Sequence, residues 1–289
     1  MKKKVLITGA KSYVGTNVET WLMKEPDKFY VETLDMKDPN WKDFDFSKFD
    51  VVFHVAGIAH VSSKKNMDSL YYKVNRDLAV EAAKHSRKNG INQFIFMSSM
   101  IIYGKENSFG NKEHIDIKKY DPTNAYGKSK LEADLKIQEL SNDNFQVSII
   151  RTPVIFGPNC KGNFPRLQSL SKKLLIIPNL NNQRSMIYID NFSEFVKRLI
   201  EKKAHGVFYP QNSEFLSTSQ ILMQTRSALG KKTLSTKMFN PIIILLTKCS
   251  SFFRKIYGNK TYDLRQSNIT FNDYNIVGNK ESIIKSINK

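Results

Sequence analysis

The sequence predicts an α/β fold, a doubly wound parallel sheet followed by a smaller lobe. Short apolar runs alternate with stretches of helical spacing, as in a parallel sheet covered by helices. The first run passes directly into a glycine-containing turn and then a helix. Several runs end in small or hydroxyl residues, as expected where the carboxyl ends of strands form a ligand-binding crevice.

Length and cysteine content limit the class of protein. The chain has 289 residues, enough for one large domain or for two that share a cleft. Cys160 and Cys249 give neither a disulfide framework nor a metal-ligand spacing, so we expect no metal site. The first residues lack the apolar core of a signal peptide, and no apolar run approaches the ~20 residues that span a bilayer. We therefore expect a cytoplasmic protein without an integral membrane segment.

The formal net charge of +18 is compatible with nucleic acid, an anionic membrane surface or an anionic small substrate as partner. The lysines are scattered, and no motif that reads nucleic acid accompanies them. We therefore expect no nucleic-acid partner. A general bias toward Lys, Asn and Ile explains the charge as well as a binding surface would.

Residues 4–8 form an apolar strand, followed by a turn from Gly9 to Gly15 and a helix over 17–23. Such a unit binds a dinucleotide diphosphate, because glycines admit close backbone approach and the helix N-terminus supplies free N–H groups. Ser12 stands where a middle glycine is usual, so a plain strand-to-helix turn is the alternative. The predicted cofactor contacts here are Gly9, Ser12, Tyr13, Val14 and Gly15.

Residues 29–35 form the second predicted strand, which ends in Asp35. A carboxylate about 20 residues after the glycine turn holds the adenosine ribose of NAD. Lys11 and Lys37 are close enough in sequence to meet a 2′-phosphate instead. NAD(H) is therefore favoured and NADP(H) stays open, and we include Met36 among the cofactor contacts.

The strand over 50–57 ends in Ala56 and Gly57, small residues against which a cofactor can lie. His60 in the next loop is a candidate substrate contact, and a loop histidine without function is the alternative. Residues 70–88 have helical apolar spacing, and Asn75 within them is a candidate structural or cofactor contact.

Ser99 ends the strand predicted over 93–99 and should therefore face the crevice of the sheet. A helix after Pro122 places Tyr126 and Lys130, four residues apart, on one face. An ammonium beside a phenol favours the phenolate, so we expect Lys130 to lower the pKa of Tyr126 below its ordinary value of about 10. The pair would then serve acid–base catalysis, and an ordinary surface tyrosine and lysine are the alternative.

After the strand at 145–151 and Pro158 the character of the chain changes. We expect an NAD(P)-binding domain over 1–157 and mainly a substrate-binding lobe over 158–289, with the segment 184–205 packing back on the first domain. Residues 242–257 mix apolar and basic side chains. A helix that closes the lobe is the favoured interpretation, and a membrane-surface helix is the alternative.

Together these motifs resemble the extended short-chain dehydrogenase/reductase family, specifically the NAD-dependent epimerases and dehydratases that act on nucleotide sugars. The resemblance runs from residue 5 to about residue 190 and implies a Rossmann fold. It implies that Tyr126 is the acid–base group, that Lys130 holds the nicotinamide ribose, and that Ser99 hydrogen-bonds the reacting oxygen. It further implies a cofactor contact at Pro153 and contacts to the nucleotide sugar from Asn163 and Arg184.

The same resemblance narrows the reaction. Dehydratases of the family place an Asp-Glu pair directly after the catalytic hydroxyl, where this chain has Met100 and Ile101. Neither residue can transfer a proton, so hydride transfer at a sugar C4 is expected.

The segments 162–167, 176–179 and 182–185 resemble capsule and O-antigen enzymes. We therefore expect 4-keto reduction of a UDP-2-acetamido-2,6-dideoxy-4-ketohexose. A UDP-sugar 4-epimerase with tightly bound NAD and a non-catalytic NAD(P)-sensing protein are the alternatives. The family often dimerises through a helix bundle that would include the Tyr126 helix, so a homodimer is also open.

Overall fold

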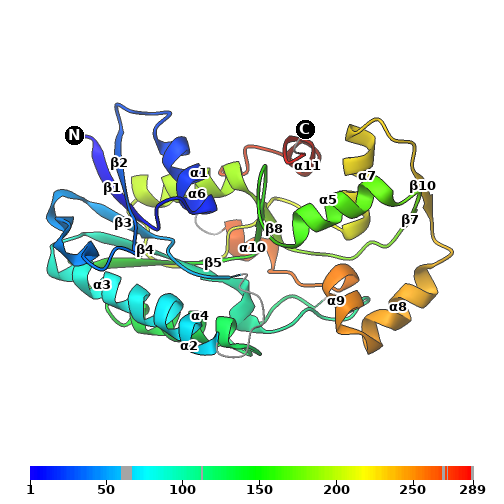
Figure 1. The fold of residues 1–289 in the computed structure, drawn as a ribbon, viewed down its shortest axis with the longest axis horizontal. Coiled ribbons are helices and arrows are strands. Elements are labelled where there is room, and N and C mark those ends of the chain that lie inside the picture. The colour runs from blue at the N-terminus through cyan, green and yellow to red at the C-terminus, as the bar shows by residue number, and fades with distance from the viewer. Residues whose placement is uncertain (60–66, 112, 269–270, 272, 288–289) are drawn as a thin grey trace. The chain divides into compact units, whose positions relative to one another are not determined.

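The computed structural model describes residues 1–59, 67–111, 113–268, 271 and 273–287, and the chain folds into two compact units (Figure 1). Unit 1 comprises Met1–Gly104, Tyr120–Thr152 and Phe192–Pro210. Unit 2 comprises Lys105–Lys119, Pro153–Asn191 and Gln211–Lys289. The domain boundary expected at residues 157–158 stays a prediction.

Unit 1 is built on a six-stranded sheet in the order β2-β1-β3-β4-β5-β9, and every neighbouring pair is parallel. The strand order reverses beside β1, because β2 lies on one side of it and β3 on the other. The carboxyl ends of strands at such a switch point form a binding crevice. The doubly wound sheet predicted from the sequence is confirmed. Its strands are β1 (Lys3–Thr8), β2 (Phe29–Leu34), β3 (Val51–His54), β4 (Gln93–Ser99), β5 (Gln146–Thr152) and β9 (Gly206–Phe208).

Helices cover both faces of this sheet (Figure 1). On one face lie α3 and α4, and on the other α1 and α6, which a hydrogen bond from Trp21 to Glu194 joins at 2.9 Å. One long helix is α-helical at both ends and π-helical between them, over Tyr72–Asp77. The helices are α1 (Tyr13–Leu22), α2 (Asp68–Tyr71), α3 (Leu78–Lys88), α4 (Ala125–Gln138) and α6 (Ile189–Glu201).

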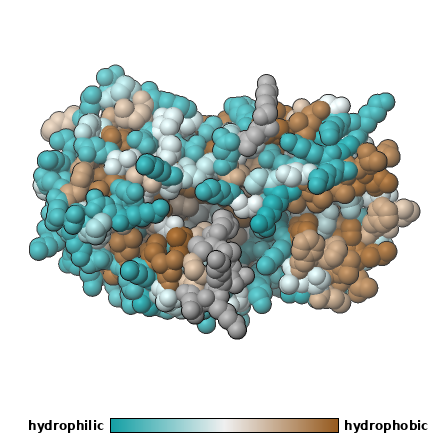
Figure 2. Space-filling model, in the orientation of Figure 1, coloured by the Kyte–Doolittle hydropathy of each residue, from teal (hydrophilic) through white to brown (hydrophobic). Residues whose placement is uncertain are grey.

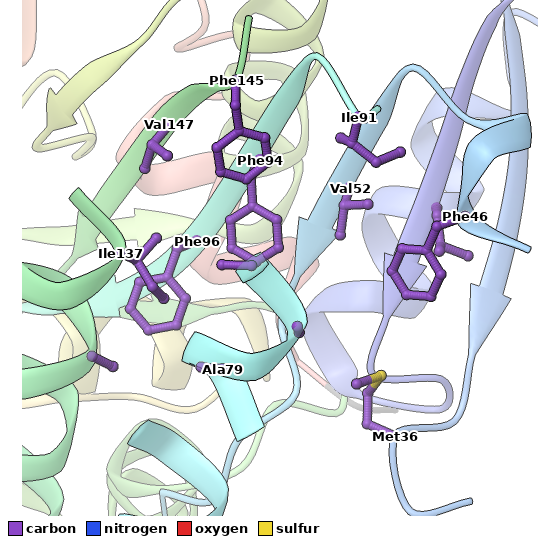
Figure 3. Close-up of a cluster of buried hydrophobic side chains, with 14 of the residues drawn as sticks. Met36, Phe46, Val52, Ala79, Ile91, Phe94, Phe96, Ile137, Phe145 and Val147 are labelled. Carbon is purple, nitrogen blue, oxygen red and sulfur yellow. The ribbon is translucent and has the colours of Figure 1, made fainter. Parts of the chain in front are cut away.

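The core between the sheet and the α3–α4 layer is aromatic and aliphatic (Figure 3). Phe94 on β4 and Phe145, the residue just before β5, have ring centroids 6.0 Å apart. Phe96 and Ile137 are fully buried beside them. Burying each such side chain contributes about 1.5–3 kcal/mol to folding. The two short 3-10 helices Trp41–Asp43 and Phe46–Lys48 add Trp41 and Phe46 to the same cluster.

Unit 2 contains two small parallel sheets, β6 with β8 and β7 with β10. Its helix α7 begins with a capping box, in which Ser217 and Gln220 each accept the other's backbone N–H. No helix within the described ranges is both long and apolar enough to cross a membrane. The elements are β6 (Val154–Phe156), α5 (Asn163–Lys173), β7 (Ile176–Pro178), β8 (Met186–Tyr188), α7 (Thr218–Ala228), β10 (Leu234–Thr236), α8 (Asn240–Cys249), α9 (Ser251–Tyr257), α10 (Leu264–Asn268) and α11 (Asn279–Lys285).

Candidate active site

The turn after β1 has the geometry of a phosphate cradle. Gly9 has φ +121°, and a Cβ there would lie 2.7 Å from the backbone nitrogen of Ala56, so only glycine lets the turn pack against the end of β3. Ser12 caps α1, since its hydroxyl accepts the Gly15 N–H at 3.1 Å. The serine that departs from the usual glycine spacing therefore fixes the start of the helix. The first N–H groups of α1 can hold a diphosphate.

Asp35 stands beside this turn. The Gly9 and Ala10 N–H groups both donate to the Leu34 carbonyl, at 2.9 and 3.1 Å, which holds the turn against the end of β2. The Asp35 carboxylate is exposed and accepts the Lys37 N–H at 3.0 Å. Met36 is buried in the core cluster (Figure 3), so a cofactor contact there would come from its backbone.

The loop after β3 is held by Asn75. This fully buried side chain accepts the Ile58 N–H at 2.8 Å and donates to the Ile58 carbonyl at 3.0 Å. The π-helical turn is what places the asparagine there, and π-bulges are frequent at functional sites. Asn75 thus positions Gly57, whereas a direct cofactor contact stays a prediction. His60 lies outside the described residues.

Ser99, Tyr126 and Lys130 come from β4 and α4. Ser99 ends β4 and accepts the Ile101 N–H at 3.3 Å, and it also hydrogen-bonds the Tyr126 hydroxyl. Lys130 is buried and donates to the Met97 carbonyl at 2.9 Å. The structure therefore brings all three side chains to the carboxyl end of β4.

The prediction that Lys130 lowers the pKa of Tyr126 is wrong for this structure. Burial raises the pKa of Tyr126, the hydrogen bond from Ser99 offsets part of the rise, and Tyr71 adds to it. The Tyr71 and Tyr126 rings lie 5.8 Å apart. Burial also lowers the pKa of Lys130 to about 8. Helical spacing correctly placed the two residues on one helix, but it could not show that both are desolvated or that the ammonium faces a carbonyl.

A buried polar network that no sequence motif indicates joins α4 to β4 and β5 next to these residues. Asp134 on α4 accepts from Ser98 at 2.5 Å and pairs with Arg151 on β5 at 2.9 Å. Arg151 also donates to the hydroxyls of Tyr103 and Tyr120, at 2.7 and 3.0 Å. Burial alone would lower the pKa of Arg151, but the hydrogen bonds and charge of Asp134 raise it overall. The signal available in the sequence was a carboxylate four residues after Lys130.

In unit 2, Arg184 belongs to a cationic cluster. Its guanidinium lies 3.4 Å from the Glu106 carboxylate and donates to the Lys255 carbonyl. Lys260, which no sequence motif indicates as a site residue, is buried nearby. Burial lowers the pKa of Lys260 to about 8, with Glu106 opposing and Arg184 adding to the shift. Two cations around one carboxylate suit an anionic ligand.

The two other predicted site residues of this part of the chain, Asn163 and Pro153, differ in their exposure to solvent. Asn163 is exposed at the start of α5, and Pro153 is buried between β5 and β6. Nowhere in the described parts of the chain do three or more His, Cys, Asp or Glu side chains gather so that they could hold a metal ion.

Comparisons with known proteins agree on one family. A model described as "NAD dependent epimerase/dehydratase family" matches residues 5–209. The chain is 31% identical, over 90% of its length and 82% of the relative, to the N-acetyl-alpha-D-glucosaminyl-diphospho-ditrans,octacis-undecaprenol 4-epimerase of Escherichia coli O157:H7. It is 28% identical, over 89% of its length and 83% of the relative, to the UDP-glucose 4-epimerase of Vibrio cholerae.

Solved structures show the same fold. The UDP-glucuronic acid 4-epimerase from Bacillus cereus, in complex with UDP-glucuronic acid and NAD, has a TM-score of 0.72 at 20% identity and covers 98% of this chain and 97% of its own. A dTDP-4-dehydrorhamnose reductase from Clostridium acetobutylicum has a TM-score of 0.64 at 21% identity, covering 81% and 82%.

Proposed function

The chain belongs to the NAD-dependent epimerase/dehydratase family and is an enzyme of the extended short-chain dehydrogenase/reductase type, and we propose that it is a 4-epimerase of a sugar carried on a diphosphate. The observation that carries the proposal is the meeting of Ser99, Tyr126 and Lys130 at the carboxyl end of β4. Both curated relatives described above cover about nine-tenths of the chain and are named 4-epimerases.

The residues around the turn after β1 fit a dinucleotide. A Cβ at Gly9 or Gly15 would collide with its neighbours, so backbone N–H groups can approach a diphosphate at the α1 N-terminus. Asp35 would hold the adenosine ribose and Lys130 the nicotinamide ribose. When bound, NAD supplies hydride transfer to and from the sugar. It is favoured over NADP because a carboxylate repels a 2′-phosphate.

The chain's own residues handle the proton and the substrate. Tyr126 would take the proton of the C4 hydroxyl and return one to the C4 oxygen, while Ser99 hydrogen-bonds that oxygen. Arg184 and Lys260 would bind the diphosphate of the substrate, and Asn163 the same nucleotide-sugar part. UDP and a lipid diphosphate are the two carriers named for the relatives.

A second candidate is the 4-ketoreductase expected from the sequence. The observation that favours it is the raised pKa of Tyr126, which burial causes. A tyrosine that keeps its proton is the donor that a new C4 alkoxide needs. Dehydration is not proposed, because Met100 and Ile101 offer no group that transfers a proton.

The test supplies purified protein with UDP-N-acetylglucosamine plus NAD⁺, and with the same sugar on a polyprenyl diphosphate plus NAD⁺. A third assay uses a UDP-2-acetamido-2,6-dideoxy-4-ketohexose plus NADH or NADPH. Interconversion of C4 epimers without net consumption of NADH supports the epimerase. Stoichiometric oxidation of NADH or NADPH by the ketosugar supports the reductase. The absence of both reactions would refute the proposal.

A pair of variants tests whether the activity depends on the Tyr126 hydroxyl. Tyr126→Phe removes that hydroxyl, and Tyr71→Phe is the matched control. The two rings are neighbours, so each variant removes one oxygen from the same region. Turnover should fall by about 10²–10⁴-fold in Tyr126→Phe alone, with NAD binding kept in both variants. Equal activity in the two variants would contradict the assigned role.

A further inference from the structure

Helix α8 has apolar side chains on two opposite sides. Ile243 is buried in a small cluster with Leu180 and Tyr257, which joins the helix to the rest of unit 2. Ile242 and Leu245, three positions apart on the other side, are 62% and 60% exposed. Residues i and i+3 are neighbours on a helix surface, so these two form a continuous outward apolar face.

This face continues over neighbouring elements of unit 2. Phe252 on α9 is 64% exposed, and Met238 just before α8 is 72% exposed. Figure 2 shows hydrophobic side chains gathered over the end of unit 2 that holds β7, β10 and α8. We call the whole set the apolar patch; its members are Leu175, Ile176, Leu234, Met238, Phe239, Ile242, Leu245 and Phe252.

The two helices that carry much of the patch are held firmly. Arg254 on α9 donates to the Thr247 carbonyl at 3.0 Å and to the Lys248 carbonyl at 2.8 Å. The Thr247 hydroxyl in turn accepts the Phe109 N–H at 3.1 Å. These bonds fix α8 and α9 to the lobe from within, so the exposure of their outer side chains is a property of the folded unit.

The chain around the patch residues is rich in positive charge. Residues 215–262 contain eight Lys or Arg and no Asp or Glu. The exposed cations among them that adjoin the patch in sequence are Lys231, Lys232, Lys237, Lys248 and Lys255. Exposed apolar side chains among lysines match the interface of an anionic bilayer, where apolar groups enter the headgroup boundary and cations pair with lipid phosphates.

We propose that the apolar patch docks the protein peripherally on an anionic membrane surface. Large exposed apolar patches mark sites of association, and the charge selects among partners. In a symmetric dimer formed through the patch, the same surface of each chain would face the other. The lysines that adjoin the patch in the two chains would then repel one another. An anionic lipid surface satisfies both the apolar side chains and the charge. The proposal goes beyond the chemistry at Tyr126 and does not depend on it.

The test is flotation of the full-length protein with vesicles of phosphatidylcholine alone or with about one-third phosphatidylglycerol. We expect binding to the anionic vesicles, at least tenfold weaker binding to the neutral ones, and release by high salt. Lys237→Gln with Lys248→Gln should weaken binding about fivefold per lysine. Leu245→Ser with Phe252→Ser should also lower binding, whereas Ile284→Ser, an exposed isoleucine of unit 2 outside the patch, should not.

All these substitutions are at exposed positions, so the fold and the turnover of a water-soluble UDP-sugar should be unchanged. Measuring this turnover beside vesicle binding separates failure of the docking proposal from failure of the proposed function. Absence of flotation with anionic vesicles would overturn the proposal. So would equal flotation of the patch variant and the control. A dimer in light scattering that the patch variant abolishes, without any vesicle binding, would instead assign the patch to a second copy of the chain.

Discussion

The buried ion pair between Asp134 and Arg151 gives the sharpest prediction for stability. The Asp134 side chain is fully buried and that of Arg151 is 3% exposed. Asp134→Asn keeps the size of the side chain but leaves the Arg151 guanidinium without a counter-charge. Removing one partner of a buried pair costs about 3–5 kcal/mol. For a chain of this size, that lowers the melting temperature by about 6–20 °C.

The assay is thermal and urea unfolding followed by circular dichroism at neutral pH. The matched control is Glu281→Gln, which breaks the pair with Lys285 at 2.7 Å on the surface of α11. An exposed pair contributes about 0.2–1 kcal/mol, so this variant should unfold close to the wild type. Asp134→Asn and Glu281→Gln are both carboxylate-to-amide changes, and the ion pairs that they break differ in burial.

A double variant tests the reasoning from the other side. Asp134→Leu with Arg151→Met replaces both charges by apolar groups, which is often neutral in buried pairs. Here it also removes the hydrogen bonds that Ser98 and Gln138 make to Asp134 and that Tyr103 and Tyr120 accept from Arg151. Each polar group left buried without a partner costs about 1–3 kcal/mol, so the double variant should be no more stable than Asp134→Asn. An Asp134→Asn protein within 1 kcal/mol of the wild type would refute the reasoning, because the buried guanidinium would then need no counter-charge.

Three further predictions concern the site and its strands. Tyr126→Phe should lower kcat by about 10²–10⁴-fold with unchanged NAD affinity in calorimetry, and a loss below tenfold would contradict an acid–base role. Gly9→Ala should weaken NAD binding at least tenfold, because the new Cβ would lie 2.7 Å from the Ala56 nitrogen and Gly9 has φ +121°. The control Gly110→Ala should not weaken NAD binding, since its Cβ would enter open space. Burial lowers the pKa of His54 to about 3, so its contribution to stability is present above about pH 6.5 and about 2 kcal/mol of it is lost at pH 5. Urea unfolding at pH 5 and 7.5 should show a smaller difference in His54→Gln than in the wild type; equal differences would show that His54 is not the titrating group.

The elements of unit 1 could be predicted because their signals are local. Each strand is a short apolar run, and the glycine turn and Asp35 follow β1 and β2 directly in the sequence. The same logic predicts that Ser99 faces the crevice, since position at the end of a parallel strand fixes position in the sheet. Even Ser12, a departure from the expected glycine spacing, has a local reason as the cap of α1.

What could not be predicted depends on partners far apart in sequence. Asp134 and Arg151 lie on different elements and meet only when α4 packs on β5. Lys260 approaches Arg184 through a bridge between distant segments. The apolar residues of α8 show the same limit, because a helix with apolar residues on several sides does not reveal which side is buried. Residues 242–257, expected as one helix, form α8 and α9 with a break at Ser250. Within α8, Ile243 packs inward whereas Ile242 does not.

The protonation state of Tyr126 bears differently on the two candidate reactions. Burial raises the pKa of Tyr126 and lowers that of Lys130 to about 8, so it favours the neutral form of both side chains. A ketoreductase needs Tyr126 only as an acid, so its kcat/KM should be flat at neutral pH and fall only where the phenol loses its proton. An epimerase needs Tyr126 as a base in one half of each turnover and as an acid in the other. Its rate should therefore pass through a maximum, with a rise on the acid side that the reductase lacks. The pH dependence of kcat/KM thus separates an enzyme that reduces C4 from one that inverts it.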